Sequence, residues 1–190
     1  ETHHKLMDVN YFGALHCCHA VLKKMKERGS GRIVLVSSVA GQIGLYGMAG
    51  YSATKFALRG LGEALAMECN PFNIKVSVIF PPDTDTPGLA KENESKPEIT
   101  KILGESGGLW DAEEVAAGTI SGVENGRHHV YFGVEGSAVA LVSSGMSQAS
   151  TVGEGLLRFL SMSLLSVIGV GWNVWCAYFC ATTLKAERKK

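Results

Sequence analysis

The sequence has no excess charge of either sign. Its 190 residues include 18 lysines and arginines and 18 aspartates and glutamates, so the formal net charge is zero. A neutral chain has no global field that would attract nucleic acid or anionic lipid. The sequence contains no stripe of lysine or arginine and no RNA-binding signature. We therefore predict no nucleic-acid partner.

Cysteines are few, and their number is odd. Of the five, Cys17 and Cys18 are adjacent, Cys69 stands alone, and Cys176 and Cys180 fall in an apolar run. None has zinc-ligand spacing together with histidine, so we predict no metal site. The same arrangement favours reduced thiols in a reducing compartment over a disulfide framework.

The apolar residues predict alternating helices and strands. Residues 6–27 and 51–69 carry apolar side chains at helical spacing and end at glycines or at an Asn-Pro pair. Residues 33–36 and 74–80 are short runs of β-branched and other apolar residues, which are typical of parallel strands buried on both faces. Helix, strand, helix and strand in this order indicate an α/β fold with a parallel sheet.

The intervening and following segments are less regular. Residues 39–50 are rich in glycine and predict a loop. Residues 83–108 are polar, without a strong period, and predict a lid over the site or a disordered loop. A helix at 111–120 with an N-cap aspartate and a short strand at 129–132 extend the α/β pattern.

The end of the chain differs in composition from the rest. Residues 159–184 include no charged side chain, and a helix of that length would reach about 39 Å, against a hydrocarbon core of about 30 Å. The run is either a helix that spans or lies on a membrane, or a helix that is buried or packed in a dimer interface. Basic residues after it would place the tail in the cytosol. We therefore divide the chain into 1–150, a folded domain, and 151–190, a hydrophobic membrane-associated helix with a basic tail.

Tyr51 and Lys55 form the most informative pair of the sequence. On a helix, residues four apart share one face, so the ammonium group of Lys55 would lie near the phenol of Tyr51. A nearby cation lowers the pKa of a tyrosine from its usual value of about 10. Such a tyrosine can donate a proton to a ketone oxygen near neutral pH. A solvated helix face is the plainer interpretation of the same spacing.

Three motifs in a fixed order carry a family resemblance. Residues 31–38 read Gly-Arg-Ile-Val-Leu-Val-Ser-Ser, the Tyr51/Lys55 pair follows, and residues 81–88 read Pro-Pro-Asp-Thr-Asp-Thr-Pro-Gly. Over about residues 6–135 this order resembles the short-chain dehydrogenase/reductase superfamily. Within that superfamily the chain is most similar to the 3-ketodihydrosphingosine reductases, on the stretches 9–13, 25–28, 41–47 and 81–88.

The resemblance implies catalytic roles. Tyr51 would donate the proton to the ketone, and Lys55 would lower the pKa of Tyr51. Ser38 would hydrogen-bond the substrate oxygen, with its neighbour Ser37 as the competing candidate. Asn10 would anchor a water relay to Lys55.

The resemblance also implies the cofactor NADPH. Its contacts would come from Asn10, Tyr51, Lys55, Pro81, Thr84 and Thr86. The residue after the first proline of the loop is usually glycine in the superfamily, but here it is Pro82. Proline lacks an N–H group and fixes φ, which changes the backbone donors that can meet the nicotinamide amide.

Members of the superfamily begin with a strand, a glycine-rich phosphate turn and a helix. Nine residues precede Asn10, so we expect this chain to be the C-terminal part of a Rossmann-like, doubly wound parallel sheet. Alone it would lack the pyrophosphate site. The residue that selects NADP over NAD would precede Glu1.

The narrower resemblance implies a function. The chain would reduce a long-chain ketone lipid, 3-ketosphinganine, to sphinganine in sphingolipid biosynthesis. Its expected place is the endoplasmic reticulum membrane, with the site facing the cytosol, and a homodimer would form through the helix at 51–69. One alternative is a steroid or retinoid dehydrogenase of the same superfamily. Another is a non-catalytic fragment with an interaction or anchoring role.

Overall fold

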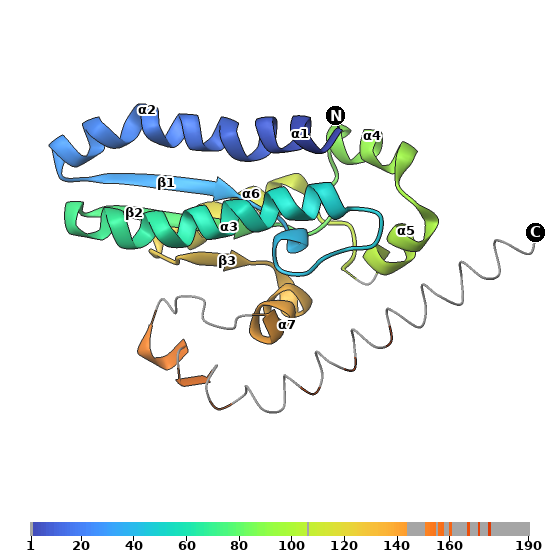
Figure 1. Cartoon of the computed structure of the whole chain (residues 1–190). Helices are drawn as coiled ribbons and strands as arrows, with labels where there is room; N and C mark the ends of the chain where they lie inside the picture. The colour runs from blue at the N-terminus through green and yellow to red at the C-terminus, as the bar shows by residue number, and fades with distance from the viewer. Residues whose placement is uncertain are drawn as a thin grey trace, which may run out of the picture.

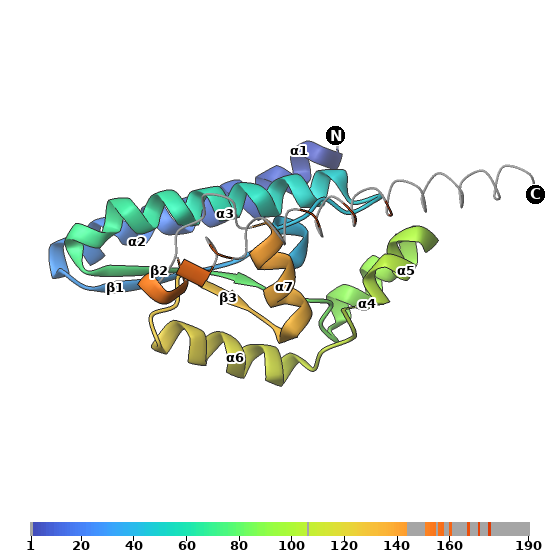
Figure 2. The same ribbon diagram turned by 90° about the horizontal axis from the view of Figure 1, so that it is seen from below.

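The structure is a computed structural model that describes residues 2–105 and 107–143 and, beyond them, only positions 151–154, 156, 157, 160, 167, 171 and 175. In the main ranges, three parallel strands form one sheet (Figure 1). Figure 2 shows α2 (Gly13–Arg28) and α3 (Ala49–Cys69) over one face of this sheet and α6 (Ala112–Glu124) over the other. The predicted α/β fold with a parallel, doubly wound sheet is confirmed.

The strands are hydrogen-bonded in chain order. They are β1 (Gly31–Val36), β2 (Ile74–Phe80) and β3 (His129–Tyr131). The central strand β2 is buried at every position except Lys75. Helices cover both of its faces, which explains why its sequence is almost continuously apolar.

The first helical region is longer than predicted. It consists of α1 (Thr2–Met7), a π-helical turn η1 (Asp8–Phe12) and α2, which follow one another without a gap. In the wide turn, the backbone N–H of Gly13 donates to the carbonyl oxygen of Asp8. The region ends at Gly29, whose φ of 67° is the left-handed conformation that favours glycine at a helix end.

The largest apolar cluster lies between α2, α3 and the sheet. Helix α3 approaches β2 closely at Gly62, where a Cβ atom would collide with the side chain of Val78. Burial of a leucine such as Leu65 in this layer contributes about 1.5–3 kcal/mol. The buried members of the cluster are Cys18, Ile33, Leu35, Leu65, Cys69, Ile74 and Val76.

The segment 83–108 contains two helices, α4 (Pro87–Ser95) and α5 (Glu98–Glu105). The prediction of a loop without regular structure is therefore wrong here. The hydroxyl of Thr86 accepts a hydrogen bond from the N–H of Leu89 at 3.2 Å, and a proline occupies the first turn. Both are start signals of a helix, and they specify α4 although its apolar periodicity is weak.

Shorter elements complete the fold. The 3-10 turns η2 (Val39–Gly41) and η3 (Asn70–Phe72) follow β1 and α3, and a helix α7 (Gly133–Ser143), which was not predicted, follows β3. Apart from the isolated positions given above, the predicted C-terminal segment 151–190 lies outside the described residues. Within the part of the chain that the structure describes, no helix has the length and apolar character needed to cross a membrane.

Candidate active site

The candidate site lies at the carboxyl ends of the parallel strands, where ligands bind in open α/β sheets. Pairing between β1 and β2 continues past the strand ends. The N–H of Ser37 donates to the carbonyl of Ile79 at 2.8 Å, and the N–H of Val39 donates to that of Pro81 at 3.1 Å. The serine motif and the proline loop, far apart in sequence, are thereby held side by side.

The two neighbouring serines have different surroundings. Ser37 is buried, and its hydroxyl donates to the backbone carbonyl of Lys55 at 2.9 Å, which ties the end of β1 to α3. The hydroxyl of Ser38 accepts from the N–H of Ala40 at 3.2 Å, and Ser38 lines the same cleft as Tyr51 and lowers the pKa of its phenol. Ser38 is therefore the serine that acts on the candidate proton donor.

Tyr51 and Lys55 lie on one face of α3, as their spacing predicts. The Nζ atom of Lys55 lies 5.3 Å from the centre of the Tyr51 ring and donates to the carbonyl oxygen of Val36 at 3.1 Å. This backbone bond holds the ammonium group at the end of β1. The lysine is thus positioned by the strand as well as by its own helix.

The direction of the Tyr51 pKa differs from the prediction. Burial of the phenol raises its pKa above the ordinary value of 10.0, the hydrogen bond of Ser38 opposes this, and Glu92 and Asp83 add to the rise. The expected net lowering is therefore wrong: removal of water from a phenolate outweighs the lowering by Ser38, and Lys55 is not among the groups that shift this pKa. Burial also lowers the pKa of Lys55, against the opposing charge of Glu92. A phenol that stays protonated at neutral pH is the form that can donate a proton.

Asn10 reaches the site through an intermediate residue. It lies in the π-helical turn η1, a kind of turn that is frequent at functional sites. Its Nδ2 atom donates to the hydroxyl of Thr54 at 3.0 Å, and that hydroxyl donates to the backbone carbonyl of Tyr51 at 2.8 Å. Asn10 therefore braces the first turn of α3, while the water relay to Lys55 stays a prediction.

The loop after β2 forms the opposite wall of the cleft. Its predicted contact residues, Pro81, Thr84 and Thr86, all line this cleft together with Ser38, Tyr51 and Lys55. The hydroxyl of Thr84 donates to the carbonyl of Pro82 at 2.9 Å, and that of Thr86 caps α4. A hydroxyl has one donor and two acceptor positions, so each retains capacity for a ligand.

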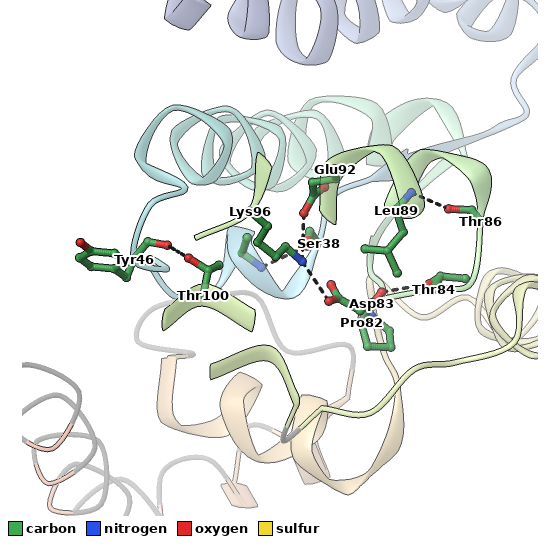
Figure 3. A network of polar contacts seen from close by, with 11 residues as sticks. Ser38, Tyr46, Pro82, Asp83, Thr84, Thr86, Leu89, Glu92, Lys96 and Thr100 are labelled. Carbon is green, nitrogen blue, oxygen red and sulfur yellow. Dashed lines mark hydrogen bonds and ion pairs between the residues drawn. The ribbon is translucent and has the colours of Figure 1, made fainter. Parts of the chain in front are cut away.

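Three charged residues of the cleft were not predicted. Figure 3 shows Lys96 between Asp83, from the loop after β2, and Glu92, from α4. The four-residue spacing of Glu92 and Lys96 is visible in the sequence as a helical ion pair. No sequence signal links Asp83 to Lys96, because the contact depends on how α4 folds back on the loop.

The arrangement can protonate a carbonyl oxygen. A cleft of ≈ 280 Å³ brings the hydroxyls of Ser38 and Tyr51 to one place, with the ammonium group of Lys55 beside them. One hydroxyl can orient the oxygen by a hydrogen bond, and the other can supply the proton. Within the described residues, no group of three or more metal-binding side chains occurs.

Comparisons with known proteins agree with this chemistry. The family model of the short chain dehydrogenases matches residues 1–97. The 3-dehydrosphinganine reductase of Danio rerio is 46% identical over 166 residues, which are 87% of this chain and 50% of that protein. The 3-ketodihydrosphingosine reductase of Bos taurus is 43% identical over 170 residues, 90% of this chain and 51% of that protein.

Among solved structures, a short-chain dehydrogenase from Streptomyces avermitilis is similar, with a TM-score of 0.59 and 26% identity. The match covers 85% of this chain and 59% of that one. The chain spans about half the length of the curated relatives it matches.

Proposed function

The chain belongs to the short-chain dehydrogenase family, and from this membership we propose that it carries the catalytic residues of an NADPH-dependent reductase of 3-ketosphinganine. The observation that carries the proposal is the meeting of Ser38, Tyr51 and Lys55 in one cleft, with the Nζ atom of Lys55 5.3 Å from the centre of the Tyr51 ring. The product would be sphinganine, in sphingolipid biosynthesis. The relatives from Danio rerio and Bos taurus, named 3-dehydrosphinganine reductase and 3-ketodihydrosphingosine reductase, support this choice of substrate.

The residues of the cleft have separate tasks in this reaction. The hydroxyl of Ser38 holds the ketone oxygen by a hydrogen bond. Tyr51 donates its phenolic proton to that oxygen as negative charge develops there, and a phenolate remains. Lys55 stabilises the phenolate by its positive charge. The chemistry that NADPH would supply, when bound, is the hydride for the carbonyl carbon.

The residues present fit the nicotinamide end of the cofactor. Lys55 provides an ammonium donor for ribose hydroxyls at the end of β1. Thr84 and Thr86 face the same cleft and retain hydrogen-bonding capacity for a carboxamide. Tyr51 and Pro81 line the cleft and complete the proposed set of cofactor contacts, whereas Asn10 acts through Thr54.

The test uses the intact protein that contains this chain, supplied with NADPH and a panel of ketones. We expect reduction of 3-ketosphinganine and much slower reduction of steroid and retinoid ketones. Tyr51→Phe removes only the hydroxyl and should lower the rate about 10²–10⁴-fold, with cofactor affinity nearly unchanged. The matched control is Tyr46→Phe, since Tyr46 joins the network of Figure 3 only through its backbone carbonyl. Wild-type rates in Tyr51→Phe would refute the proposed proton donor.

We further propose attachment to the endoplasmic reticulum membrane, with the site facing the cytosol. A long-chain ketone partitions into lipid, so an enzyme held at the membrane meets it at high local concentration. The uncharged run 159–184 and the basic residues after it support this. Extraction with carbonate tests it, since a protein that is washed off has no spanning helix.

The proposed homodimer would form through α3. Two large apolar side chains of this helix, Phe56 and Met67, are exposed, and they would be covered by a second copy. Replacement of both by polar residues should lower the mass measured by light scattering from dimer to monomer. An unchanged mass would show that the dimer does not form through these two side chains.

A further inference from the structure

The cleft contains a lysine between two carboxylates. The Nζ atom of Lys96 lies 3.1 Å from Oδ2 of Asp83 and 3.1 Å from Oε1 of Glu92 (Figure 3). The lysine side chain is 5% exposed, whereas those of Asp83 and Glu92 are 43% and 37% exposed. Both carboxylates and the lysine line the same cleft as Tyr51.

The charges of this group do not balance. Two carboxylates face one ammonium group, so the three side chains carry one net negative charge. Both carboxylates line the same cleft as Tyr51 and raise the pKa of its phenol. Glu92 also acts on Lys55, but that lysine is held at the end of β1 by the carbonyl of Val36.

A purely structural clamp between α4 and the loop would need only one carboxylate. The part of Asp83 that Lys96 leaves exposed can accept further hydrogen bonds from a cation, because a carboxylate has about four acceptor positions. A monovalent cation bound at Asp83, the more exposed carboxylate, would neutralise these three side chains, and Glu92 has Lys55 as a further positive neighbour. A primary ammonium suits it chemically, since Lys96 itself is a primary ammonium held by these two oxygens.

The substrate proposed above carries such a group. In 3-ketosphinganine, the carbon that bears the amino group is bonded directly to the carbonyl carbon. Resting on that proposed function, we propose that Asp83 and Glu92 bind the substrate ammonium and make the site selective for ketones with an adjacent amino group. Lys96 acts as a positioning residue, because it holds both carboxylates in the cleft.

Binding of the ammonium also orients the reacting carbonyl. Because the two carbons are neighbours, an ammonium held by Asp83 fixes the carbonyl oxygen within a narrow range of positions beside Ser38 and Tyr51. The carboxylates thus contribute to placement as well as to affinity.

The test compares two ketones in the intact protein with NADPH. One is 3-ketosphinganine, and the other is the same hydroxy ketone with hydrogen in place of the amino group. The variant Asp83→Asn keeps the size of the side chain and removes its charge. The matched control is Asp85→Asn, the same change two residues further along the loop, at an exposed side chain.

We expect Asp83→Asn to lower kcat/KM for the amino ketone by about 10- to 100-fold, mainly through KM, since hydrogen bonds to charged groups contribute in this range. The value for the ketone without the amino group should stay within about twofold, and Asp85→Asn should change neither. Equal losses on both ketones would overturn the inference, because they would show a structural role. An unchanged preference for the amino ketone in Asp83→Asn would overturn it too.

A second variant tests the inference in case Asp83→Asn does not fold. Glu92→Gln changes a half-exposed side chain on α4 and should shift the preference in the same direction by about three- to tenfold. If Asp83→Asn does not fold and Glu92→Gln keeps the preference, the inference is wrong. A wild-type protein that does not reduce the amino ketone refutes the proposed function itself. Reduction by wild type with an unaltered preference in the variants refutes only the role of the carboxylates.

Discussion

Helix α3 and helix α4 face the same cleft, but they are held in different ways. Buried side chains of α3 pack on the sheet, among them Leu58 and Leu65, and Gly62 brings the helix backbone against β2. In α4 no described side chain is buried. It is fixed at its ends, by the cap of Thr86 and by the ion pairs of Lys96.

This difference has an energetic consequence. Apolar burial contributes about 25 cal/mol per Å², so a packed helix face is worth several kcal/mol. Ion pairs with exposed partners contribute only about 0–1 kcal/mol each. The proton donor therefore lies on the firmly held element, whereas Glu92 lies on the weakly held one and Asp83 on the loop that Lys96 joins to it.

The largest effect should come from breaking the contact of α3 with the sheet. In Gly62→Ala the new Cβ atom would collide with Val78, and overpacking of this kind costs about 1–3 kcal/mol. Gly60→Ala is the matched control, because nothing lies within 4 Å of a Cβ atom there. It should stabilise the helix by about 0.5–1 kcal/mol. Urea unfolding of both variants checks the pair, and equal effects would contradict the close packing at Gly62.

A smaller effect should follow from loss of the lysine at α4. Lys96→Met keeps an unbranched side chain but removes the ion pairs to Asp83 and Glu92. Because both carboxylates are partly exposed, the loss of global stability should be about 1 kcal/mol or less. Hydrogen exchange should become faster in α4 and remain unchanged in α3. Faster exchange throughout α3 would show that the two helices are not held independently.

The smallest effect concerns the protonation of Tyr51. Its pKa is raised in the folded chain, above the value of 10.0 that it has in an unfolded one. The protonated phenol therefore persists at neutral pH, and its contribution to stability is present below pH 10 and lost as pH rises through the folded-state pKa. An ultraviolet difference titration of wild type against Tyr51→Phe, without cofactor, should place this ionisation above 10. An ionisation near neutral pH would show instead that the pKa of Tyr51 is lowered, as the spacing of Tyr51 and Lys55 predicts.

Much of α3 and of the strands could be predicted from sequence. Local patterns of the sequence predict these elements, because the period of the apolar residues follows the period of the helix or strand. Such patterns are the spacing of Tyr51 and Lys55 and the apolar runs of β1 and β2. The choice between Ser37 and Ser38 is not local. It depends on which hydroxyl points back to the carbonyl of Lys55, and only the contact of β1 with α3 decides this.

Helix α4 and its contact with the loop after β2 could not be predicted from the sequence. The helix is short and polar, so it is specified by the cap of Thr86 rather than by an apolar period. The contact of Asp83 with Lys96 joins the loop after β2 to the end of α4. The rise in the Tyr51 pKa results from burial, which a helical spacing does not reveal.

The central claim is that α3 performs the chemistry and the α4 side selects the substrate. Steady-state reduction of 3-ketosphinganine by Tyr51→Phe and Asp83→Asn, measured side by side in the intact protein, tests it most directly. The account predicts that Tyr51→Phe lowers kcat with KM nearly unchanged, and that Asp83→Asn raises KM with kcat nearly unchanged. Loss of the same kinetic parameter in both variants would contradict it.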